Sequence, residues 1–241
     1  MKILAIDSTG TVASTAVMAD GVLTSCVTSD GEKKHSITLM PMIESAMKTA
    51  GLKMKDIDAI ATACGPGSFT GLRIGCALAK GLAIPGNTPI IPVPTLEALA
   101  CNITGAGSDT LICPIMDARR QQVYNGIYIN DKELVTIRDQ RALPIAEVVE
   151  DIEKIFAKNS ELKRVIFLGD GCRVYMSYIE ENLKVPFETA PPQAMTQRAS
   201  SVAALGELKY NEGKYVSPGD FSPVYIRKSQ AEREREEKER S

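Results

Sequence analysis

The chain has 241 residues, of which 44% are hydrophobic and 24% are charged, and its formal net charge is -2. These proportions are typical of a globular protein with one large domain or two smaller ones, and they give no overall attraction to nucleic acid. Six scattered cysteines without a Cys-x-x-Cys pair, together with one histidine, His35, argue against a Cys/His zinc site. No apolar run reaches membrane-spanning length and no signal peptide is visible, so we expect a cytoplasmic protein that does not bind membranes.

The first predicted element is a buried strand over residues 2–6 that ends on Asp7, Ser8 and Thr9. A predicted hairpin follows, with strands over residues 15–18 and 22–27. The actin/Hsp70/sugar-kinase nucleotide fold begins in this order, and its first loop would cradle phosphate. A polar turn in which Asp7 caps backbone groups explains the same residues equally well, and both interpretations stay open.

Residues 36–50 form a predicted helix with more apolar side chains than one buried face needs. One face consists of Leu39, Ile43, Ala46 and Ala50. A second face consists of Ile37, Met40 and Met47, with Glu44 between the two. A second, Met-rich face indicates either a deeper core position or an adaptable binding surface.

A glycine-rich junction, Gly65-Pro66-Gly67-Ser68-Phe69-Thr70-Gly71-Leu72-Arg73-Ile74-Gly75, joins a buried strand to a helix over residues 71–83. The P-loop, dinucleotide and nucleophile-elbow spacings all fail here. The spacing instead favours an elbow that lets a helix pack tightly on a strand, with Ser68 or Thr70 as the helix cap. Gly71, Gly75 and Ala79 lie at i, i+4 spacing and make a smooth track on this helix, for which packing within the chain is the expected use.

The second half of the chain repeats the style of the first. A linker over residues 102–109 places the domain boundary there, which gives a first domain of 1–104 and a second of 105–227. A strand over residues 111–116 ends in Asp117-Ala118-Arg119-Arg120, and short strands follow. Strand, polar loop and meander in the same order as at the N-terminus predict a weak internal duplication.

A second candidate phosphate loop, Gly169-Asp170-Gly171, connects a strand over residues 164–168 to a helix over residues 173–183. Asp170 would repel a phosphate, so an ordinary strand-helix turn is the favoured interpretation. The candidate vestigial phosphate loops are therefore Asp7, Ser8 and Thr9 in the first half and Gly169 and Gly171 in the second. Residues 215–227 are predicted to be an extended strap, and residues 228–241 a charged tail that frays or is disordered.

Three stretches together resemble the bacterial TsaB (YeaZ-type) family: the glycine-rich junction, residues 1–9, and Asp117-Ala118-Arg119. The resemblance runs from Met1 to about Arg227. It implies an α/β fold of tandem actin-like, ribonuclease-H-like (ASKHA) domains, the second smaller and degenerate. It also implies a required, non-catalytic subunit for forming N6-threonylcarbamoyladenosine at position 37 of tRNA. Such a subunit would support the catalytic subunit TsaD in a complex with the ATPase TsaE, and would meet tRNA only through that complex.

The same resemblance implies an inactive homologue with no catalytic residue, no metal and no tightly bound cofactor. In TsaD, two histidines four residues apart hold a metal, and Thr95 and Leu99 stand at the matching positions here. Leucine cannot ligate a metal. An ATP-dependent small-molecule kinase or a metallopeptidase of the same fold is the alternative. ATP or ADP could still bind at the partner interface through Arg119, or that arginine could simply pair with a nearby acid.

The partner surface is expected where the two predicted helices lie side by side. Alone, the chain would form a homodimer through this surface, and TsaD would replace one copy in the complex. The candidate interface residues are Ile37, Met40, Glu44, Met47, Gly71, Arg73, Gly75, Leu78 and Ala79.

Overall fold

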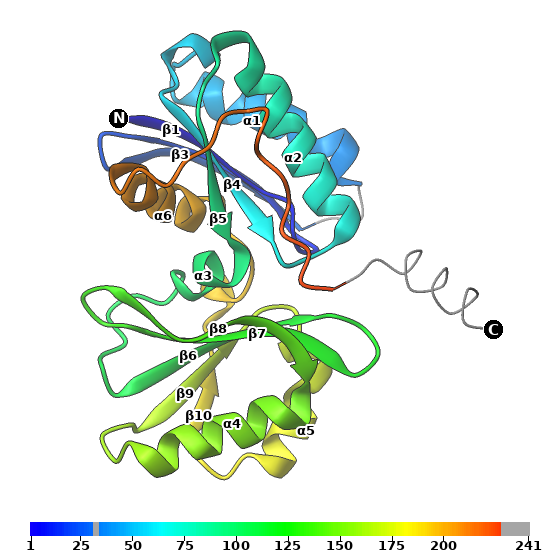
Figure 1. The fold of residues 1–241 in the computed structure, drawn as a ribbon, viewed down its shortest axis with the longest axis vertical. Helices are drawn as coiled ribbons and strands as arrows, with labels where there is room; N and C mark the ends of the chain where they lie inside the picture. The colour runs from blue at the N-terminus through cyan, green and yellow to red at the C-terminus, as the bar shows by residue number, and fades with distance from the viewer. Residues whose placement is uncertain (31–33, 228–241) are drawn as a thin grey trace, which may run out of the picture.

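The computed structural model describes residues 1–30 and 34–227, so the predicted charged tail over residues 228–241 lies outside the described residues. Two α/β halves stack along the long axis of the molecule, each around a five-stranded mixed sheet (Figure 1). Among the described residues, no helix is both long and apolar enough to span a membrane.

The first sheet has the strand order β3-β2-β1-β4-β5. Its strands are β1 (Lys2–Asp7), β2 (Ala13–Ala19), β3 (Val22–Ser29), β4 (Ala59–Gly65) and β5 (Ile90–Pro94). Helices α1 (His35–Thr49) and α2 (Phe69–Ala83) cover one face, and α6 (Ala199–Asn211) covers the other (Figure 1). Residues 3–6 of strand β1 are all apolar because alternate side chains enter both cores: Leu4 and Ile6 on the α1/α2 side, Ile3 and Ala5 on the α6 side.

The second sheet repeats this plan, with the order β10-β9-β6-β7-β8. Its strands are β6 (Thr110–Asp117), β7 (Gln122–Asn130), β8 (Leu134–Pro144), β9 (Arg164–Leu168) and β10 (Phe187–Thr189). Starting from β8, the order and the directions of pairing match those of the first sheet, so the predicted duplication and the tandem ribonuclease-H-like fold are confirmed.

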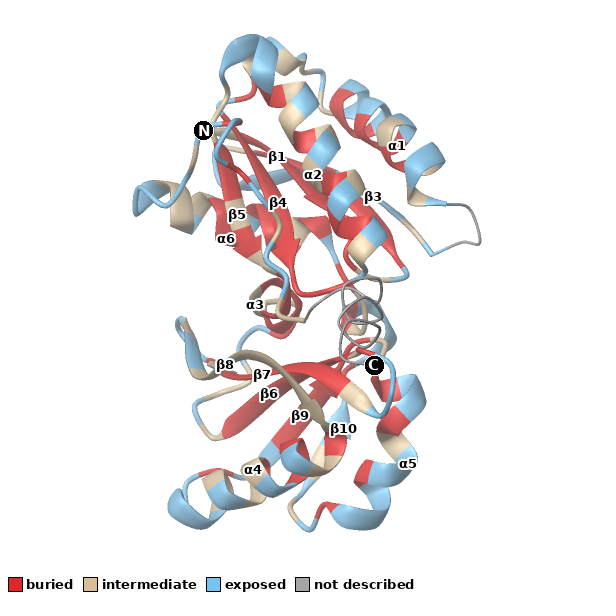
Figure 2. Ribbon diagram, turned by 45° about the vertical axis from the view of Figure 1, so that its right-hand side comes forward, coloured by how far each residue is buried: buried red, intermediate tan, exposed pale blue. Residues whose placement is uncertain are grey.

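Helices α4 (Ile145–Lys158) and α5 (Cys172–Asn182) pack on the outer face of the second sheet. The short helix α3 (Thr95–Ala100) packs on its inner face, between the halves (Figure 2). An ion-pair cluster ties α4 to the edge strand β8, since Asp151 accepts from Arg138 at 3.0 Å and from Arg141 at 2.6 Å. Short 3-10 helices lie at Met54–Asp56, Ile84–Gly86 and Pro192–Ala194.

The end of the chain returns to the first half, which departs from the expected second domain of 105–227. Helix α6 packs across β1 and β2, and Gly206 approaches so closely that a Cβ there would lie 2.6 Å from the Cβ of Ala61. The predicted strap then follows the edge of the first sheet, where Val216 pairs with Ile90 and the N–H of Val224 donates to the Cys64 carbonyl at 2.7 Å. The first half is therefore built from two separate segments of sequence.

Candidate functional site

The glycine-rich junction is a packing elbow between β4 and α2. Ser68 caps the helix, since its Oγ accepts from the N–H of Gly71 at 3.2 Å. A Cβ at Gly71 would lie 1.9 Å from the Ser8 carbonyl oxygen, and a Cβ at Gly75 would lie 2.6 Å from the Ser8 Oγ. Helix α2 thus rests directly on the loop that follows β1. The spacing predicted a packing elbow, but not this loop as its partner.

This packing corrects part of the expected partner surface. Gly71, Gly75 and Ala79 are buried against the sheet, so the small-residue track serves the monomer and not an interface. Met47 is also buried, with 7% of its surface exposed, because it lies one helical turn after Ile43 on the same core-facing stripe of α1.

The other expected interface residues do reach the surface. Ile37 is 67% exposed, Met40 is partly exposed and Glu44 is exposed on α1. On α2, Arg73 is exposed and Leu78 is partly exposed. The two helices lie next to each other on the same face of the first sheet (Figure 1).

The first candidate phosphate loop is held by its own side chains. The Oδ1 of buried Asp7 accepts from the N–H of Thr9 at 2.9 Å and from the Thr9 Oγ1 at 2.7 Å. Burial raises the pKa of Asp7 to about 6, although the bonds from Thr9 act in the opposite direction. The Ser8 Oγ donates to the Gly71 carbonyl at 2.9 Å, so the loop supports α2. Of the two open interpretations, these contacts favour the capped turn.

The second candidate loop is also committed to internal contacts. The N–H of Gly169 donates to the Met195 carbonyl at 2.8 Å, and the N–H of Gly171 donates to the Ile115 carbonyl at 3.1 Å. Asp170 accepts from the N–H of Asp117 at 3.2 Å, and burial raises the pKa of its carboxyl. Two adjacent carboxyl groups and amides that are already bonded do not suit a triphosphate.

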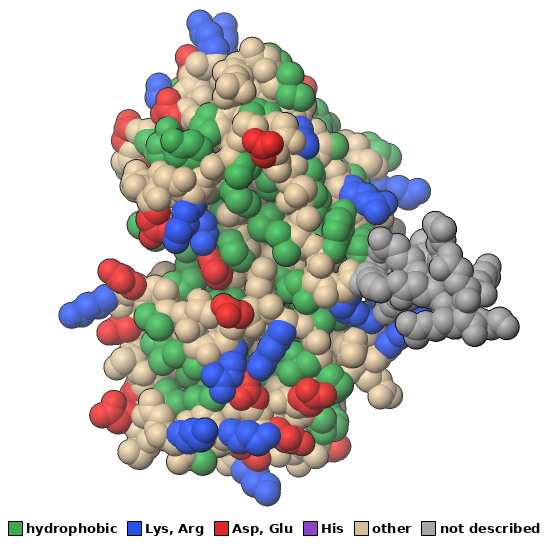
Figure 3. All heavy atoms as spheres, viewed as in Figure 1, with side chains coloured by type: hydrophobic (Ala, Val, Ile, Leu, Met, Phe, Trp, Pro, Cys, Tyr) green, Lys and Arg blue, Asp and Glu red, His purple; other side chains and the backbone are tan. Residues whose placement is uncertain are grey.

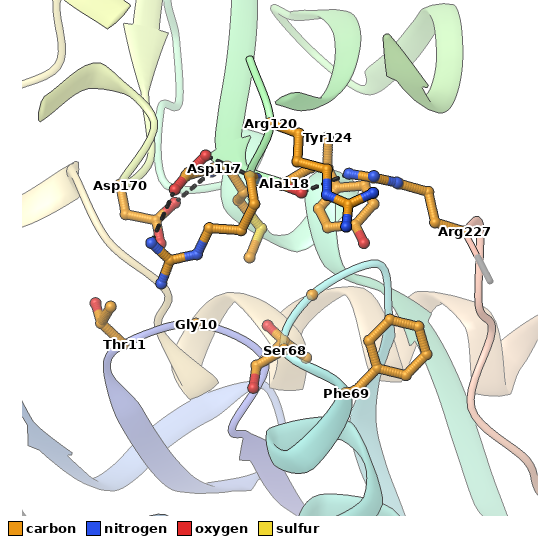
Figure 4. A pocket seen from close by; sticks show the side chains of 14 residues that line it. Gly10, Thr11, Ser68, Phe69, Asp117, Ala118, Arg120, Tyr124, Asp170 and Arg227 are labelled. Carbon is orange, nitrogen blue, oxygen red and sulfur yellow. Dashed lines mark hydrogen bonds and ion pairs between the residues drawn. The ribbon is translucent and has the colours of Figure 1, made fainter. Parts of the chain in front are cut away.

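A cavity of about 380 Å³, which we call the cleft, separates the two candidate loops at the junction of the two halves (Figure 4). The first half contributes Thr9, Gly10, Thr11, Gly67, Ser68 and Phe69 to its lining. The second half contributes Met116, Asp117, Ala118, Arg119, Arg120, Tyr124 and Asp170, and Arg227 comes from the strap. Sequence reasoning placed some of these residues in loops, but it did not bring Phe69, Tyr124 and Arg227 to the site.

The arginines of this cavity sit on the tight turn between β6 and β7. Arg119, Arg120 and Gln121 have φ values of 64°, 56° and 59°, a left-handed conformation that costs about 1–2 kcal/mol per non-glycine residue. The turn is closed by a bond from the N–H of Gln122 to the Arg119 carbonyl at 3.2 Å. Arg119 also pairs with Asp117 at 3.6 Å, while its side chain stays 88% exposed. In the chain on its own, Arg119 therefore pairs with a nearby acid, Asp117, which is one of the two roles that the sequence left open for it.

The strap connects helix α2 to this turn. Tyr225 stacks on Phe69 with ring centroids 4.9 Å apart, and the Arg73 Nε donates to the Tyr225 hydroxyl at 3.3 Å. Two residues later, Arg227 donates to the Ala118 carbonyl in the second half. The sequence predicted the extended strap from its prolines, but no sequence signal showed where it would dock.

The positions that match the TsaD histidines have structural roles here. The buried Thr95 accepts from the N–H of Gly65 at 3.1 Å and so holds the elbow, and Leu99 is packed in the core with 1% exposed. Within residues 1–30 and 34–227, no group of three or more His, Cys, Asp or Glu side chains is arranged to hold a metal ion.

Comparison with known proteins gives consistent matches. The family model "TsaD: tRNA N6-adenosine threonylcarbamoyltransferase" matches residues 24–235. The chain is 32% identical to the tRNA threonylcarbamoyladenosine biosynthesis protein TsaB of Bacillus subtilis, over 96% of each chain. It is 28% identical to the protein of the same name from Escherichia coli, again over 96% of each chain. Among solved structures, YeaZ from Pseudomonas aeruginosa matches with a TM-score of 0.74 and 23% identity, over 93% of this chain and 99% of that one.

Proposed function

The chain belongs to the TsaB (YeaZ-type) family and has its role in tRNA threonylcarbamoyladenosine biosynthesis, and we propose that it acts there as the non-catalytic partner of TsaD. In this proposal it binds and supports the catalytic subunit through the outer face of α1 and α2. Threonylcarbamoyl transfer itself takes place on TsaD.

The observation that carries this proposal is the exposed apolar face of α1. Ile37 is 67% exposed beside Met40, on a helix whose opposite side already fills the core with Leu39, Ile43 and Met47. Large apolar side chains that the core does not need favour association. Arg73 and Glu44 flank them with opposite charges, a pattern that suits pairing between two related surfaces.

The family match supports TsaD as the occupant of this face. A model of the TsaD family matches residues 24–235, which include both α1 and α2, so we expect TsaD to have related helices at this place in its own fold. Two copies of this chain would pair by the same contact, with two-fold symmetry, when TsaD is absent. TsaE in the assembly, and a nucleotide at the subunit boundary near Arg119, stay predictions from the resemblance.

The roles of Thr95 and Leu99 support the non-catalytic part of the proposal. One bonds to the elbow and the other fills the core, so neither position is available to ligate a metal. The purified chain is expected to show no ATP turnover, no peptidase activity and no stoichiometric zinc or iron. Activity in any of these assays, abolished by a point substitution in the cleft, would support the kinase or metallopeptidase alternative instead.

The decisive experiment replaces Ile37 by Asp and compares it with Leu208→Asp as a matched control. Leu208 is 60% exposed on α6, on the opposite face of the first sheet, so both variants place a new charge on an exposed apolar site. We expect Ile37→Asp to fold normally but to be monomeric by light scattering and to lose binding to TsaD, while Leu208→Asp keeps both properties. Equal behaviour of the two variants would refute the assignment of this face.

A further inference from the structure

A continuous strip of arginine and aromatic side chains runs from α2 to the mouth of the cleft. It consists of Tyr225, Arg227, Arg120 and Arg119, and we call it the arginine strip; Arg73 on α2, which belongs to the proposed TsaD face, marks its border. Its continuity follows from contacts: Arg73 bonds to Tyr225, and Arg227, two residues further along the strap, bonds to the turn that carries Arg119 and Arg120. A narrow crevice that includes Tyr225 is also lined by Phe69, Tyr124 and Arg227. These three residues line the cleft as well, where Figure 4 labels them.

The exposed charge along this strip is positive, although the whole chain has a net charge of -2. Arg119 and Arg120 are exposed, as is Arg73 at its border. The cleft carboxylates of Asp117 and Asp170 are less exposed, and each already accepts a backbone hydrogen bond. Asp117 accepts from the N–H of Arg119, and Asp170 accepts from the N–H of Asp117. Figure 3 shows basic side chains at the right-hand edge near the junction of the two halves, as well as elsewhere on this face.

The chemistry of the strip suits a nucleic-acid strand. Guanidinium groups bind phosphate oxygens in a planar, two-point manner. Tyr225 is 41% exposed while its ring lies nearly parallel to Phe69, at an angle of 8°. This braced aromatic pair is a platform on which an unpaired base can stack, a contact worth about 1–3 kcal/mol per base.

We propose that the arginine strip binds the phosphate backbone and an unpaired base of the tRNA, so that this chain contacts the substrate RNA directly. The inference rests on the proposed function, since it takes the RNA to be the tRNA that the complex modifies. It goes beyond the expectation that tRNA is met only through the complex, because it assigns part of the tRNA contact to this chain.

The arrangement favours an RNA strand over a free nucleotide. The amides of Gly169 and Gly171 are already bonded, and the carboxyl groups of Asp117 and Asp170 line the cleft, so a triphosphate is poorly accommodated there. The arginines instead spread outward over the surface, from the turn to the strap. That distribution fits several phosphates in a row and not one deeply bound phosphate group.

The test compares Arg119→Glu/Arg120→Glu with Lys158→Glu/Lys184→Glu, a control with the same change in net charge. Lys158 and Lys184 are exposed on the second half, and neither lines the cavities beside the strip. The left-handed backbone of the turn is no less favourable for glutamate than for arginine, since both are non-glycine residues without a branched Cβ, so the first variant should fold. Binding of fluorescently labelled tRNA is measured by anisotropy, for the chain alone and for the reconstituted complex with TsaD, over a range of salt concentrations.

We expect the turn variant to weaken tRNA binding by about tenfold at 100 mM salt and to reduce the salt slope by about 0.7 for each lost phosphate contact. The control variant should bind like the parent chain. Light scattering reports separately whether the complex with TsaD assembles, so a failure of the proposed function is distinguishable from a failure of this inference.

Two outcomes would overturn the inference. One is unchanged tRNA affinity and salt slope in the turn variant, with the complex intact. The other is that the two arginines are needed for binding ATP, measured by calorimetry on the chain alone, but not for binding tRNA.

Discussion

The contact between Gly71 and the loop after β1 predicts opposite effects for the same substitution at two positions of α2. In a helix interior, alanine is more favourable than glycine by about 1 kcal/mol. At Gly81 a new Cβ meets nothing within 4 Å, so Gly81→Ala should collect most of this gain. At Gly71 the new Cβ would lie 1.9 Å from the Ser8 carbonyl oxygen, which is far inside van der Waals contact.

Relieving that overlap requires α2 or the loop to move by about 1.5 Å to reach ordinary contact near 3.4 Å. The obstacle is backbone, and it also holds the Ser8 bond to the Gly71 carbonyl, so it cannot simply rotate away. Overpacking of this kind costs about 1–3 kcal/mol, and occasionally more, which exceeds the helical gain. We therefore expect Gly71→Ala to lower the free energy of unfolding by about 2 kcal/mol.

Thermal denaturation followed by circular dichroism measures both effects. For a chain of this size, Gly71→Ala should lower Tm by about 4–8 °C, and Gly81→Ala should raise it by about 2–4 °C. If Gly71→Ala were as stable as the parent chain but failed to dimerise or to bind TsaD, the track would be an interface after all. That result would refute the packing described above.

Three further predictions concern stability. Because burial raises the pKa of Asp7 to about 6, the free energy of unfolding of the parent chain should fall by up to about 3 kcal/mol between pH 4 and pH 6 as this carboxyl ionises. Denaturant titrations at several pH values should show a smaller fall for Asp7→Asn. For Asp151, burial tends to raise the pKa but the bonds from two β8 arginines lower it overall. Ionised Asp151 should therefore stabilise the fold above pH 4, and this stabilisation should disappear as pH falls further. Asp151→Asn should lower the free energy of unfolding by about 1–3 kcal/mol at pH 7 but by little at pH 3. Thr95→Val leaves the elbow N–H of Gly65 without its bond and should cost about 1–3 kcal/mol in urea unfolding, whereas an unchanged midpoint would show that this bond is dispensable.

Local patterns in the sequence predicted much of the fold. The repeated order of strand, polar loop and meander was enough to predict the duplication, because hydrophobic periodicity is local. The glycine spacing likewise predicted the elbow, although the partner it packs against, Ser8, is 63 residues away from Gly71. Long-range docking was harder to predict, and α6 was assigned to the second half because nothing in its own sequence specifies which sheet it covers.

The site divides in the same way. Ile37 and Met40 were predicted to reach the surface, and Ile37 is exposed and Met40 partly exposed. Met47 was placed on the wrong face of α1, since two apolar faces on one helix cannot be ranked by composition alone. The stacking of Tyr225 on Phe69 joins positions 156 residues apart in the chain, 225 and 69. Contacts of that kind depend on the completed fold and leave no trace in local spacing.

The return of the chain to the first half also sets an order for folding during synthesis. The second half, from β6 to β10, is one uninterrupted segment and can complete its outer core as soon as it leaves the ribosome. The first half cannot, because the face of its sheet lined by Ile3 and Ala5 stays uncovered until α6 has been made. Strand β1 is thus made before the second half but is among the last elements to be fully buried, and a chain interrupted before residue 199 would leave that apolar face open to aggregation.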